Sequence, residues 1–315
     1  MKLWYNGKMM NVEDATIPIT WMSPRISSGV FDGVRGYWNA GQQKLFMFRL
    51  QEHMDRFWEG CRIQKLNFDF SKKDLIKAAI DLIRINAFRE DIYLAPNAFL
   101  GIDIAKGGNP NLLTKAEVFL CCRAWPSTLG RREPIDCGIS SWQRIADHSM
   151  PPRVKCFANY NNYRLATLEV NQNGYEDYFS AIMLNQKGKV AEGAMATLFL
   201  IKGGTVVTPS LNNDILESIT RDAVLRLFER ELQIPVIERD VNRTELYTAE
   251  EAFLCGTGSE LIPVKSIDRY PVGNGKDGGP VTQKLVKIFE QVCRGEVANY
   301  AEWRTGIPPD GVEIG

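Results

Sequence analysis

The chain has very few histidines and no cysteine pattern typical of a metal site. Only His53 and His148 occur in 315 residues, and the seven cysteines show no spacing typical of zinc ligands. We therefore expect no metal site, and a histidine-based nucleophile triad has few candidates. An odd number of cysteines is also unusual for a disulfide framework, and it favours free thiols in a reducing cytosol.

The chain also lacks net charge and long apolar runs. Its 38 basic and 38 acidic residues cancel, so no overall field favours nucleic acid or an anionic membrane. No run approaches the ~18 apolar residues of a membrane-spanning helix, and the first residues lack the apolar core of a signal peptide. We expect a cytoplasmic protein that acts on small molecules and binds neither nucleic acid nor a membrane.

Length and hydrophobic periodicity predict two domains with α+β structure. A chain of 315 residues exceeds the usual size of one core. The first 122 residues predict a small N-terminal α/β domain, and residues 135–315 a larger C-terminal domain. Between them, residues 123–134 are rich in Pro, Gly and charge, which is typical of a linker.

The pattern within each domain predicts particular elements. In residues 1–122 we expect a hairpin with an Asn-Gly turn over 4–10, strands over 33–37, 45–48, 92–100 and 116–124, and helices over 50–64 and 72–88. In residues 135–315 we expect strands over 136–142, 179–185, 197–201, 205–208, 251–255 and 261–267, and helices over 160–172, 219–232 and 283–294. We expect the tail after Thr305 to be loosely ordered.

Four signals follow one another in an order that suits pyridoxal 5'-phosphate (PLP). Lys155 can carry the cofactor as a Schiff base, and Glu192 can face its pyridine nitrogen. Thr220, near the start of a helix, and Thr257, between two glycines, can hold its phosphate. Arg56 would complete the phosphate site as a bidentate donor.

Each of these residues also has an ordinary structural interpretation. Lys155 could be a surface lysine, and Glu192 a solvated carboxylate in a turn. Thr220 could be a helix N-cap, and Thr257 part of a tight turn. Arg56 could be a solvated arginine paired with Glu52 one turn earlier. Tyr160 could be a core aromatic, and His53 is more typical of a structural residue. The joint order favours the PLP site.

In this order the chain resembles the PLP-dependent enzymes of fold type IV, the branched-chain aminotransferase group. The segments that carry the resemblance are Val30–Tyr37, Glu52–Arg56, Lys155–Tyr160, Glu192–Ala194, Ile215–Asp222 and Gly256–Thr257. The resemblance implies a two-domain fold whose C-terminal domain has a pseudo-barrel β core. It also implies that Lys155 is the Schiff-base lysine, which moves the proton between the substrate and the cofactor.

The resemblance extends to further residues. It implies that Tyr160 faces the phenolic oxygen of the cofactor, that Leu216 packs on its ring, and that Arg56, Ile219, Thr220 and Thr257 hold its phosphate. For the substrate it implies Phe31, Arg35, Tyr93 and the backbone of Thr257 and Gly258. It implies a homodimer, in which residues near 103–108 reach across to the partner.

The chain departs from the family pattern at several positions. Ile26 stands where the family usually has tyrosine, and Ala95 where bacterial members often have an arginine that engages the distal carboxylate of glutamate. Met195 and Ser218 replace glycines. Arg25 or Arg153 could compensate for the missing charge. The departures at Ile26 and Ala95 affect the substrate side only.

We therefore expect transamination between a hydrophobic, branched-chain L-amino acid and a 2-oxo acid such as 2-oxoglutarate. Three alternatives stay open on the same evidence. The chain could be a D-amino-acid or (R)-amine aminotransferase of the same fold, or an aminodeoxychorismate-type lyase. It could also be a non-catalytic protein that retains PLP.

Overall fold

A computed structural model describes residues 1–21, 23–109, 113–172 and 178–308. The chain divides into two compact units. The first unit comprises Met1–Ser127, Val154–Ala158 and Val292–Gly315, and the second comprises Thr128–Arg153 and Asn159–Gln291. Both units are therefore discontinuous in sequence. The domain boundaries expected at residues 1–122, 123–134 and 135–315 stay a prediction.

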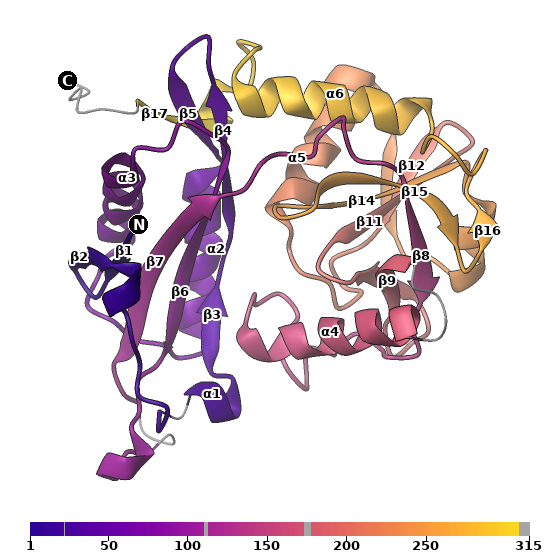
Figure 1. The fold of residues 1–315 in the computed structure, drawn as a ribbon. Helices are drawn as coiled ribbons and strands as arrows, with labels where there is room; N and C mark the ends of the chain where they lie inside the picture. Colours follow the sequence, from indigo (N-terminus) through magenta and orange to yellow (C-terminus); the bar gives the residue numbers. More distant parts are fainter. Residues whose placement is uncertain (22, 110–112, 173–177, 309–315) are drawn as a thin grey trace. The chain divides into compact units, whose positions relative to one another are not determined.

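The first unit contains an antiparallel sheet of eight strands (Figure 1). Its order is β17-β5-β4-β6-β7-β1-β2, and β3 pairs with β6. The strands are β1 (Lys2–Tyr5), β2 (Lys8–Asn11), β3 (Gly29–Phe31), β4 (Val34–Asn39), β5 (Lys44–Phe48), β6 (Ile92–Leu100), β7 (Ala116–Ala124) and β17 (Arg304–Ile307). Asn6 and Gly7 both have positive φ in the turn between β1 and β2, which confirms the expected Asn-Gly hairpin.

Two helices, α2 (Leu50–Ile63) and α3 (Lys72–Asn86), contact each other and this sheet. Ser71 and Asp74 form a capping box at the start of α3, which satisfies backbone N–H groups of its first turn. Short helical segments complete the unit: η1 (Val12–Asp14), α1 (Ser23–Ile26), η2 (Ile104–Lys106) and η5 (Ala301–Trp303).

Side chains alternate between the two faces of this sheet. Leu94 and Cys122 are buried on the face that carries the helices, where Asn86 of α3 donates to the Cys122 sulfur. Tyr93 and Arg123 point to the opposite face, since successive strand residues alternate. Along β7, the side chains on that opposite face (Glu117, Phe119 and Cys121) are less buried than those beneath the helices (Val118, Leu120 and Cys122).

The second unit contains a curled sheet of nine strands in the order β10-β9-β8-β15-β14-β11-β12-β13, with β16 paired to β15 (Figure 1). The strands are β8 (Ile135–Ile139), β9 (Tyr178–Leu184), β10 (Val190–Gly193), β11 (Thr197–Lys202), β12 (Thr205–Pro209), β13 (Val236–Arg239), β14 (Glu251–Gly256), β15 (Glu260–Ile267) and β16 (Tyr270–Pro271). A buried apolar cluster lies on this sheet and includes Leu198, Leu254 and Val264. The expected α+β fold with a curled β core is confirmed.

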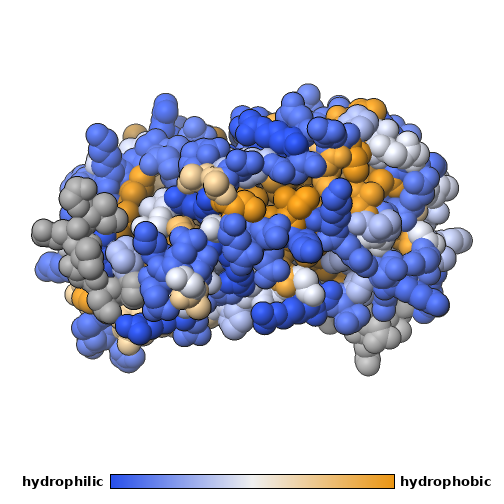
Figure 2. Space-filling view, turned by 90° about the horizontal axis from the view of Figure 1, so that it is seen from above, coloured by the Kyte–Doolittle hydropathy of each residue, from blue (hydrophilic) through white to orange (hydrophobic). Residues whose placement is uncertain are grey.

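The remaining helices are α4 (Phe157–Gln172), α5 (Ile219–Leu227), η4 (Arg243–Thr248) and α6 (Pro280–Arg294). A π-helical segment, η3 (Phe228–Leu232), follows α5 directly, so the helix expected over 219–232 changes its hydrogen-bond pattern at Phe228. None of the helices in the described ranges is long and apolar enough to cross a membrane. Figure 2 shows a mostly hydrophilic face with apolar side chains exposed in more than one place.

Most of the expected strands and helices are confirmed within a few residues at their ends. The strands β3, β13, β16 and β17 were not expected. The expectation of a loose tail after Thr305 is wrong as far as Ile307, because β17 pairs with β5 along Arg304–Ile307. Residues 309–315 of the tail lie outside the described residues.

Candidate active site

Lys155 is held by strand β3 through its own main chain. The Phe31 N–H donates to the Lys155 carbonyl at 3.0 Å, and Val30 forms a β-bridge with Cys156. The Lys155 side chain is half-buried, and its Nζ lies 4.9 Å from the centre of the Phe31 ring. The Phe31 and Phe157 rings are 5.8 Å apart. The Lys155 amine therefore lies beside an aromatic, apolar surface.

Asp32, the residue after Phe31, is fully buried and joins three groups. His53 Nδ1 lies 2.8 Å from its Oδ1, and the Gly33 N–H donates to the same oxygen at 2.6 Å. Arg56 binds both carboxylate oxygens, through Nε and Nη2, each at 2.8 Å. Burial alone would raise the pKa of Asp32, but Arg56 and His53 hold the pKa of this carboxyl well below its usual range.

The alternative interpretation of Arg56, a solvated residue paired with Glu52, is wrong. Glu52 instead accepts from Arg49 at 2.7 Å, and Arg56 is a mostly buried side chain, 13 % exposed. The Asp32 carboxylate fixes the plane of its guanidinium, as a bidentate pair does. Asp32, the only acid in the mostly uncharged segment Gly29–Tyr37, was the sequence signal that could have found this contact.

His53 is a buried structural residue, as expected, 1 % exposed. Burial lowers its pKa, the Asp32 carboxylate raises it in part, and the Arg56 and Lys155 charges lower it again, so the pKa stays below its ordinary value. The neutral ring then donates from Nδ1 to Asp32.

Glu192, near the end of β10, is a buried carboxylate whose two short hydrogen bonds both go to the same oxygen. Arg144 Nε and the Tyr163 hydroxyl donate to Oε1 at 2.8 and 2.7 Å. Oε2 accepts only from the Leu216 N–H, at 3.3 Å, among the residues that the structure describes. The interpretation of Glu192 as a solvated turn residue is therefore wrong, since it is 2 % exposed.

Arg144 and Tyr163 belong to this site and were missed by the sequence analysis. The Arg144 guanidinium stacks on the Tyr163 ring at 4.4 Å, and its buried Nη1 has no partner within the described ranges. Burial and the Glu192 charge raise the pKa of Tyr163 well above its usual value, so its hydroxyl stays protonated and donates. Tyr163 stacks edge-on with Tyr160 at 5.3 Å, and their i, i+3 spacing on one helix was an available signal.

The start of α5 supplies backbone N–H groups. Ser218 caps the helix, and its side chain accepts from the Arg221 N–H at 3.2 Å. Thr220 is therefore not the N-cap but the second residue of the helix, and both Ile219 and Thr220 are buried. Helix N-termini favour anions. The replacement of a family glycine by Ser218 thus provides a cap.

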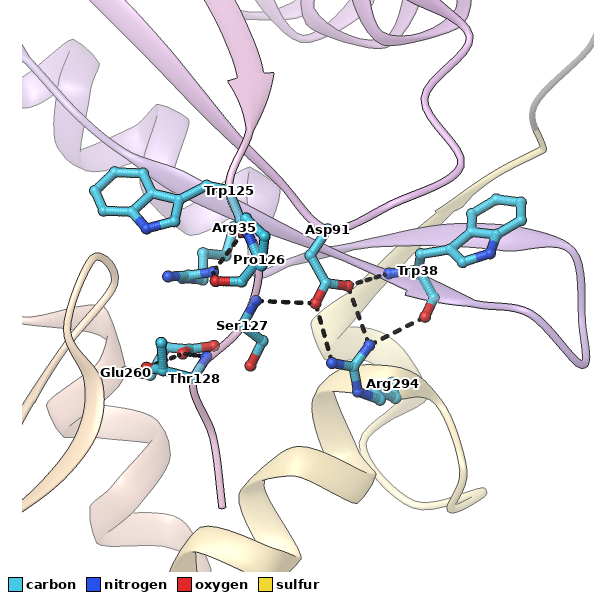
Figure 3. A network of polar contacts seen from close by, with 9 residues as sticks. All are labelled: Arg35, Trp38, Asp91, Trp125, Pro126, Ser127, Thr128, Glu260 and Arg294. Carbon is cyan, nitrogen blue, oxygen red and sulfur yellow. Dashed lines mark hydrogen bonds and ion pairs between the residues drawn. The ribbon is translucent and has the colours of Figure 1, made fainter. Parts of the chain in front are cut away.

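Thr257 and Gly258 lie in the turn between β14 and β15, and both are half-buried. The turn closes on Glu260, which is 1 % exposed and has a φ of 57°. The backbone N–H and the hydroxyl of Thr128 donate to Glu260 Oε2, at 2.7 and 3.1 Å (Figure 3). Met195, at another replaced glycine, has a φ of 67°, a backbone conformation that glycine adopts without strain.

The residues expected to bind substrate are partly packed against one another. Arg35 is 2 % exposed and donates from Nη1 to the Trp125 carbonyl at 3.0 Å (Figure 3). The Tyr93 ring lies 4.7 Å from the Trp125 ring. Ile26 is 49 % exposed on the short helix α1. Arg153, a residue that could have compensated for Ala95, forms an ion pair with Glu217 at 3.1 Å.

The family model described as amino-transferase class IV matches residues 29–267. The chain belongs to this family. It is 36% identical over 305 residues to a probable branched-chain-amino-acid aminotransferase of Aquifex aeolicus (strain VF5), with 96% of each chain covered. It is 33% identical to the branched-chain-amino-acid aminotransferase of Escherichia coli (strain K12) over 304 residues, again with 96% of each covered.

Solved structures of branched-chain aminotransferases agree with this family. The branched-chain amino acid aminotransferase of Thermobaculum terrenum in its PLP-form has a TM-score of 0.90 and 37% identity, covering 97% of this chain and 98% of that one. The branched-chain aminotransferase of the archaeon Thermoproteus uzoniensis, solved with norvaline, has a TM-score of 0.88 and 32% identity, covering 98% and 99%.

The expected site residues of this class IV aminotransferase fall into two groups. The first unit holds Phe31, Arg35, Arg56, Tyr93 and Lys155. The second unit holds Tyr160, Glu192, Leu216, Ile219, Thr220, Thr257 and Gly258. Within each group, hydrogen bonds and ring contacts join several of these side chains. No cluster of three metal-ligating side chains occurs among the residues described.

Proposed function

We propose that this chain transfers the amino group of a branched-chain L-amino acid to 2-oxoglutarate with PLP as its cofactor. Its curated relatives are named branched-chain-amino-acid aminotransferases, and the matching family is that of class IV amino-transferases. The observation that carries the proposal is the buried Glu192 carboxylate, whose Oε1 is saturated while Oε2 accepts one long hydrogen bond. Such an oxygen can still accept from a protonated ring nitrogen.

The donor set of the chain fits PLP. When bound, PLP acts as an electron sink that stabilises negative charge on the substrate carbon. Glu192 would accept a hydrogen bond from the protonated ring nitrogen, and Arg144 and Tyr163 hold the Glu192 carboxylate in one orientation. Leu216, whose N–H bonds Glu192, is the proposed cover of the ring. Tyr160, beside Tyr163, is the proposed donor to the phenolic oxygen.

Each unit offers donors that suit a phosphate group. In the second unit these are the N–H groups at the start of α5, at Ile219 and Thr220, and the Thr257 turn. In the first unit, Asp32 orients the Arg56 guanidinium. An arginine fixed in this way can bind a phosphate without losing much side-chain entropy.

Lys155 is the proposed catalytic residue. Its amine would hold the cofactor covalently, and the same amine would act as the base and acid that moves the proton on the substrate Cα. The apolar Phe31 ring beside Nζ reduces competing hydration of the amine. Phe31 and Tyr93 would line the pocket for the substrate side chain, and the Thr257–Gly258 backbone would bind its α-carboxylate.

The proposal is tested by mixing the purified holoenzyme with amino donors and following the absorbance of bound PLP. L-leucine, L-isoleucine and L-valine should convert the cofactor to its amine form, and D-leucine or an (R)-amine should not. Lys155→Ala should abolish the conversion and the covalent attachment detected after borohydride reduction.

Two results would overturn the proposal. Release of pyruvate from aminodeoxychorismate without an amino acceptor would indicate lyase chemistry. A cofactor band that no donor converts would indicate a protein that binds PLP without turnover. Covalent attachment at the wild-type level in Lys155→Ala would instead show that the lysine assignment is wrong.

We also propose that the chain forms a homodimer in the cytoplasm. Ile17, Ile19 and Ile26 are exposed apolar side chains, Ile19 at 93 %, and a partner would cover them. None of the seven cysteines, which all lie within the described ranges, forms a disulfide, and this suits a reducing compartment. Light scattering at micromolar concentration should give twice the mass of 35.6 kDa, and a monomer would contradict the assembly.

A further inference from the structure

Three side chains form a row across the first sheet. The register pairs Arg35 of β4 with Tyr93 of β6, and Tyr93 with Arg123 of β7. Directly opposed strand residues share a face, with their Cβ atoms about 5 Å apart. The row therefore lies on the face that α2 and α3 leave uncovered. Ala95 and Cys121 form the next pair on that face, and neither side chain is long enough to reach over the row.

The row converges on Trp125, the residue just after β7. The Arg123 guanidinium lies 4.4 Å from the indole centre, the Arg35 guanidinium 5.3 Å, and the Tyr93 ring 4.7 Å. Stacking on an indole holds a guanidinium in one plane and leaves its edge N–H groups pointing outward. Arg123 is thus an oriented donor.

The two arginines differ in their hydrogen-bond partners. Arg35 is buried and donates from Nη1 to main-chain carbonyls, those of Trp125 at 3.0 Å and Pro126 at 3.5 Å (Figure 3). Arg123 is exposed, and within the described ranges it makes no hydrogen bond and no ion pair with a carboxylate. Its charge acts on Cys121, whose pKa burial raises and Arg123 lowers. The row therefore ends in an exposed positive charge with no acid paired to it among the described residues.

A series of contacts within the same unit connects this face to Lys155. Lys155 Nζ lies against Phe31, two residues before Gly33. A Cβ on Gly33 would lie 1.7 Å from the Tyr93 hydroxyl, so that hydroxyl rests on the Gly33 backbone. From Gly33 the path passes along the Tyr93 ring to Trp125 and Arg123. A substrate at Lys155 can extend along this path.

We propose that Arg123 binds the distal carboxylate of a dicarboxylic 2-oxo acid acceptor, with Tyr93 and Trp125 lining the path to it. The proposal rests on the proposed transamination and names the residue that selects its acceptor. Arg35 supports the site by fixing Trp125 through its carbonyl. The small side chain of Ala95 leaves room beside the row for the carbon chain of the acceptor.

The test compares the wild-type holoenzyme with Arg123→Gln and Arg123→Lys. With L-leucine as donor, kcat/KM for 2-oxoglutarate should fall on the order of tenfold or more in Arg123→Gln, because one charge-assisted hydrogen bond is lost. It should fall less in Arg123→Lys, which keeps the charge. With 2-oxo-3-methylvalerate, an acceptor that has no distal carboxylate, kcat/KM should change little in either variant.

A binding measurement gives a second readout. Glutarate, which has both carboxylates but no keto group, should inhibit the wild type competitively against 2-oxoglutarate, with a weaker inhibition constant in Arg123→Gln. Arg62→Gln is the matched control. Arg62 is an exposed arginine at the end of α2, and removing it changes net charge equally without touching the row.

The outcomes separate this inference from the proposed function. If the wild type converts L-leucine and 2-oxo-3-methylvalerate but Arg123→Gln uses 2-oxoglutarate as well as the wild type does, the role of Arg123 is wrong and the transamination stands. A wild type that converts L-leucine but does not accept 2-oxoglutarate at all would overturn both the role of Arg123 and the acceptor named in the proposed function, while transamination of the donor would stand. If the wild type does not convert any amino donor, the proposed function itself fails.

Discussion

Arg144 donates from Nε to Oε1 of Glu192 across 2.8 Å, and the two side chains are only 1 % and 3 % exposed. A buried ion pair is weak evidence for stability as a whole, but removing one partner leaves the other charge buried without compensation. Glu192 would keep the Tyr163 hydroxyl and the Leu216 N–H, which do not neutralise its charge.

Arg144→Met should therefore lower the free energy of unfolding by about 3–5 kcal/mol. Urea unfolding without added PLP measures the change. Arg226→Met is the control, since Arg226 pairs with Asp222 at the surface, where both side chains are more than 40 % exposed. That variant should lose at most about 1 kcal/mol. Equal losses in the two variants would contradict the idea that Arg144 neutralises a buried charge on Glu192.

His53 should make the protein less stable in mild acid. Burial depresses the pKa of the His53 imidazole in the folded state. As the pH falls below about 6.5, the imidazole therefore becomes protonated in the unfolded chain while it stays neutral in the folded protein. Stability is then full above about pH 6.5 and falls as the pH drops toward the folded-state pKa, by at most ~1.4 kcal/mol per pH unit.

Urea unfolding between pH 7 and pH 5 tests this dependence. His53→Asn, whose amide can still donate to Asp32, should show a flatter profile than the wild type. His148→Asn removes an exposed histidine and should follow the wild-type profile. A steep profile in His53→Asn would assign the acid loss to other groups.

Ser218 should contribute measurably to stability as the cap of α5. Its side chain accepts from the Arg221 N–H at 3.2 Å. Ser218→Ala should cost about 1 kcal/mol in the free energy of unfolding, whereas Ser218→Gly should cost only a few tenths, because glycine tolerates the N-cap position. The order of the two variants is the check, and a glycine variant less stable than the alanine variant would refute the capping role.

Gly33 should be required for the position of Tyr93. A Cβ at Gly33 would meet the Tyr93 hydroxyl at 1.7 Å, so Gly33→Ala must displace that ring. Because misplacement of a positioning group by about 1 Å can cost up to a hundredfold, we expect kcat/KM for L-leucine to fall roughly tenfold to a hundredfold. Gly41→Ala, where the new Cβ stays 3.4 Å from its nearest atom, should leave kcat/KM unchanged.

Local patterns in the sequence predicted the elements whose signals are local. The helices α2 and α3 follow the 3.6-residue period, and β6 and β7 match the expected 92–100 and 116–124. The strand β17 has no comparable signal. Its four residues are ordered by pairing with β5, a strand more than 250 residues earlier in the chain, and no local pattern reports such a contact.

The candidate site shows the same division. The order of Lys155, Glu192, Thr220 and Thr257 was readable, because each occurs in a short distinctive segment. The partner of Arg56 could not be predicted in this way. Glu52, four residues earlier, is the nearer acid in sequence, but in the fold Glu52 binds Arg49 and Arg56 binds Asp32. The row that includes Arg123 depends on strand register, which sequence spacing does not give. Arg144 lies in the loop after β8, and its contact with Glu192 joins residues 48 positions apart in the chain.

The bond between the Phe31 N–H and the Lys155 carbonyl limits how the enzyme can be remodelled. An insertion or deletion in β3, or in the loop that leads to Lys155, would slide the lysine along its strand partner and change which atoms its amine can reach. Altered specificity is therefore better sought by exchanging side chains on β6 and β7. Their backbone can stay fixed while the pocket changes, and the lysine keeps its register.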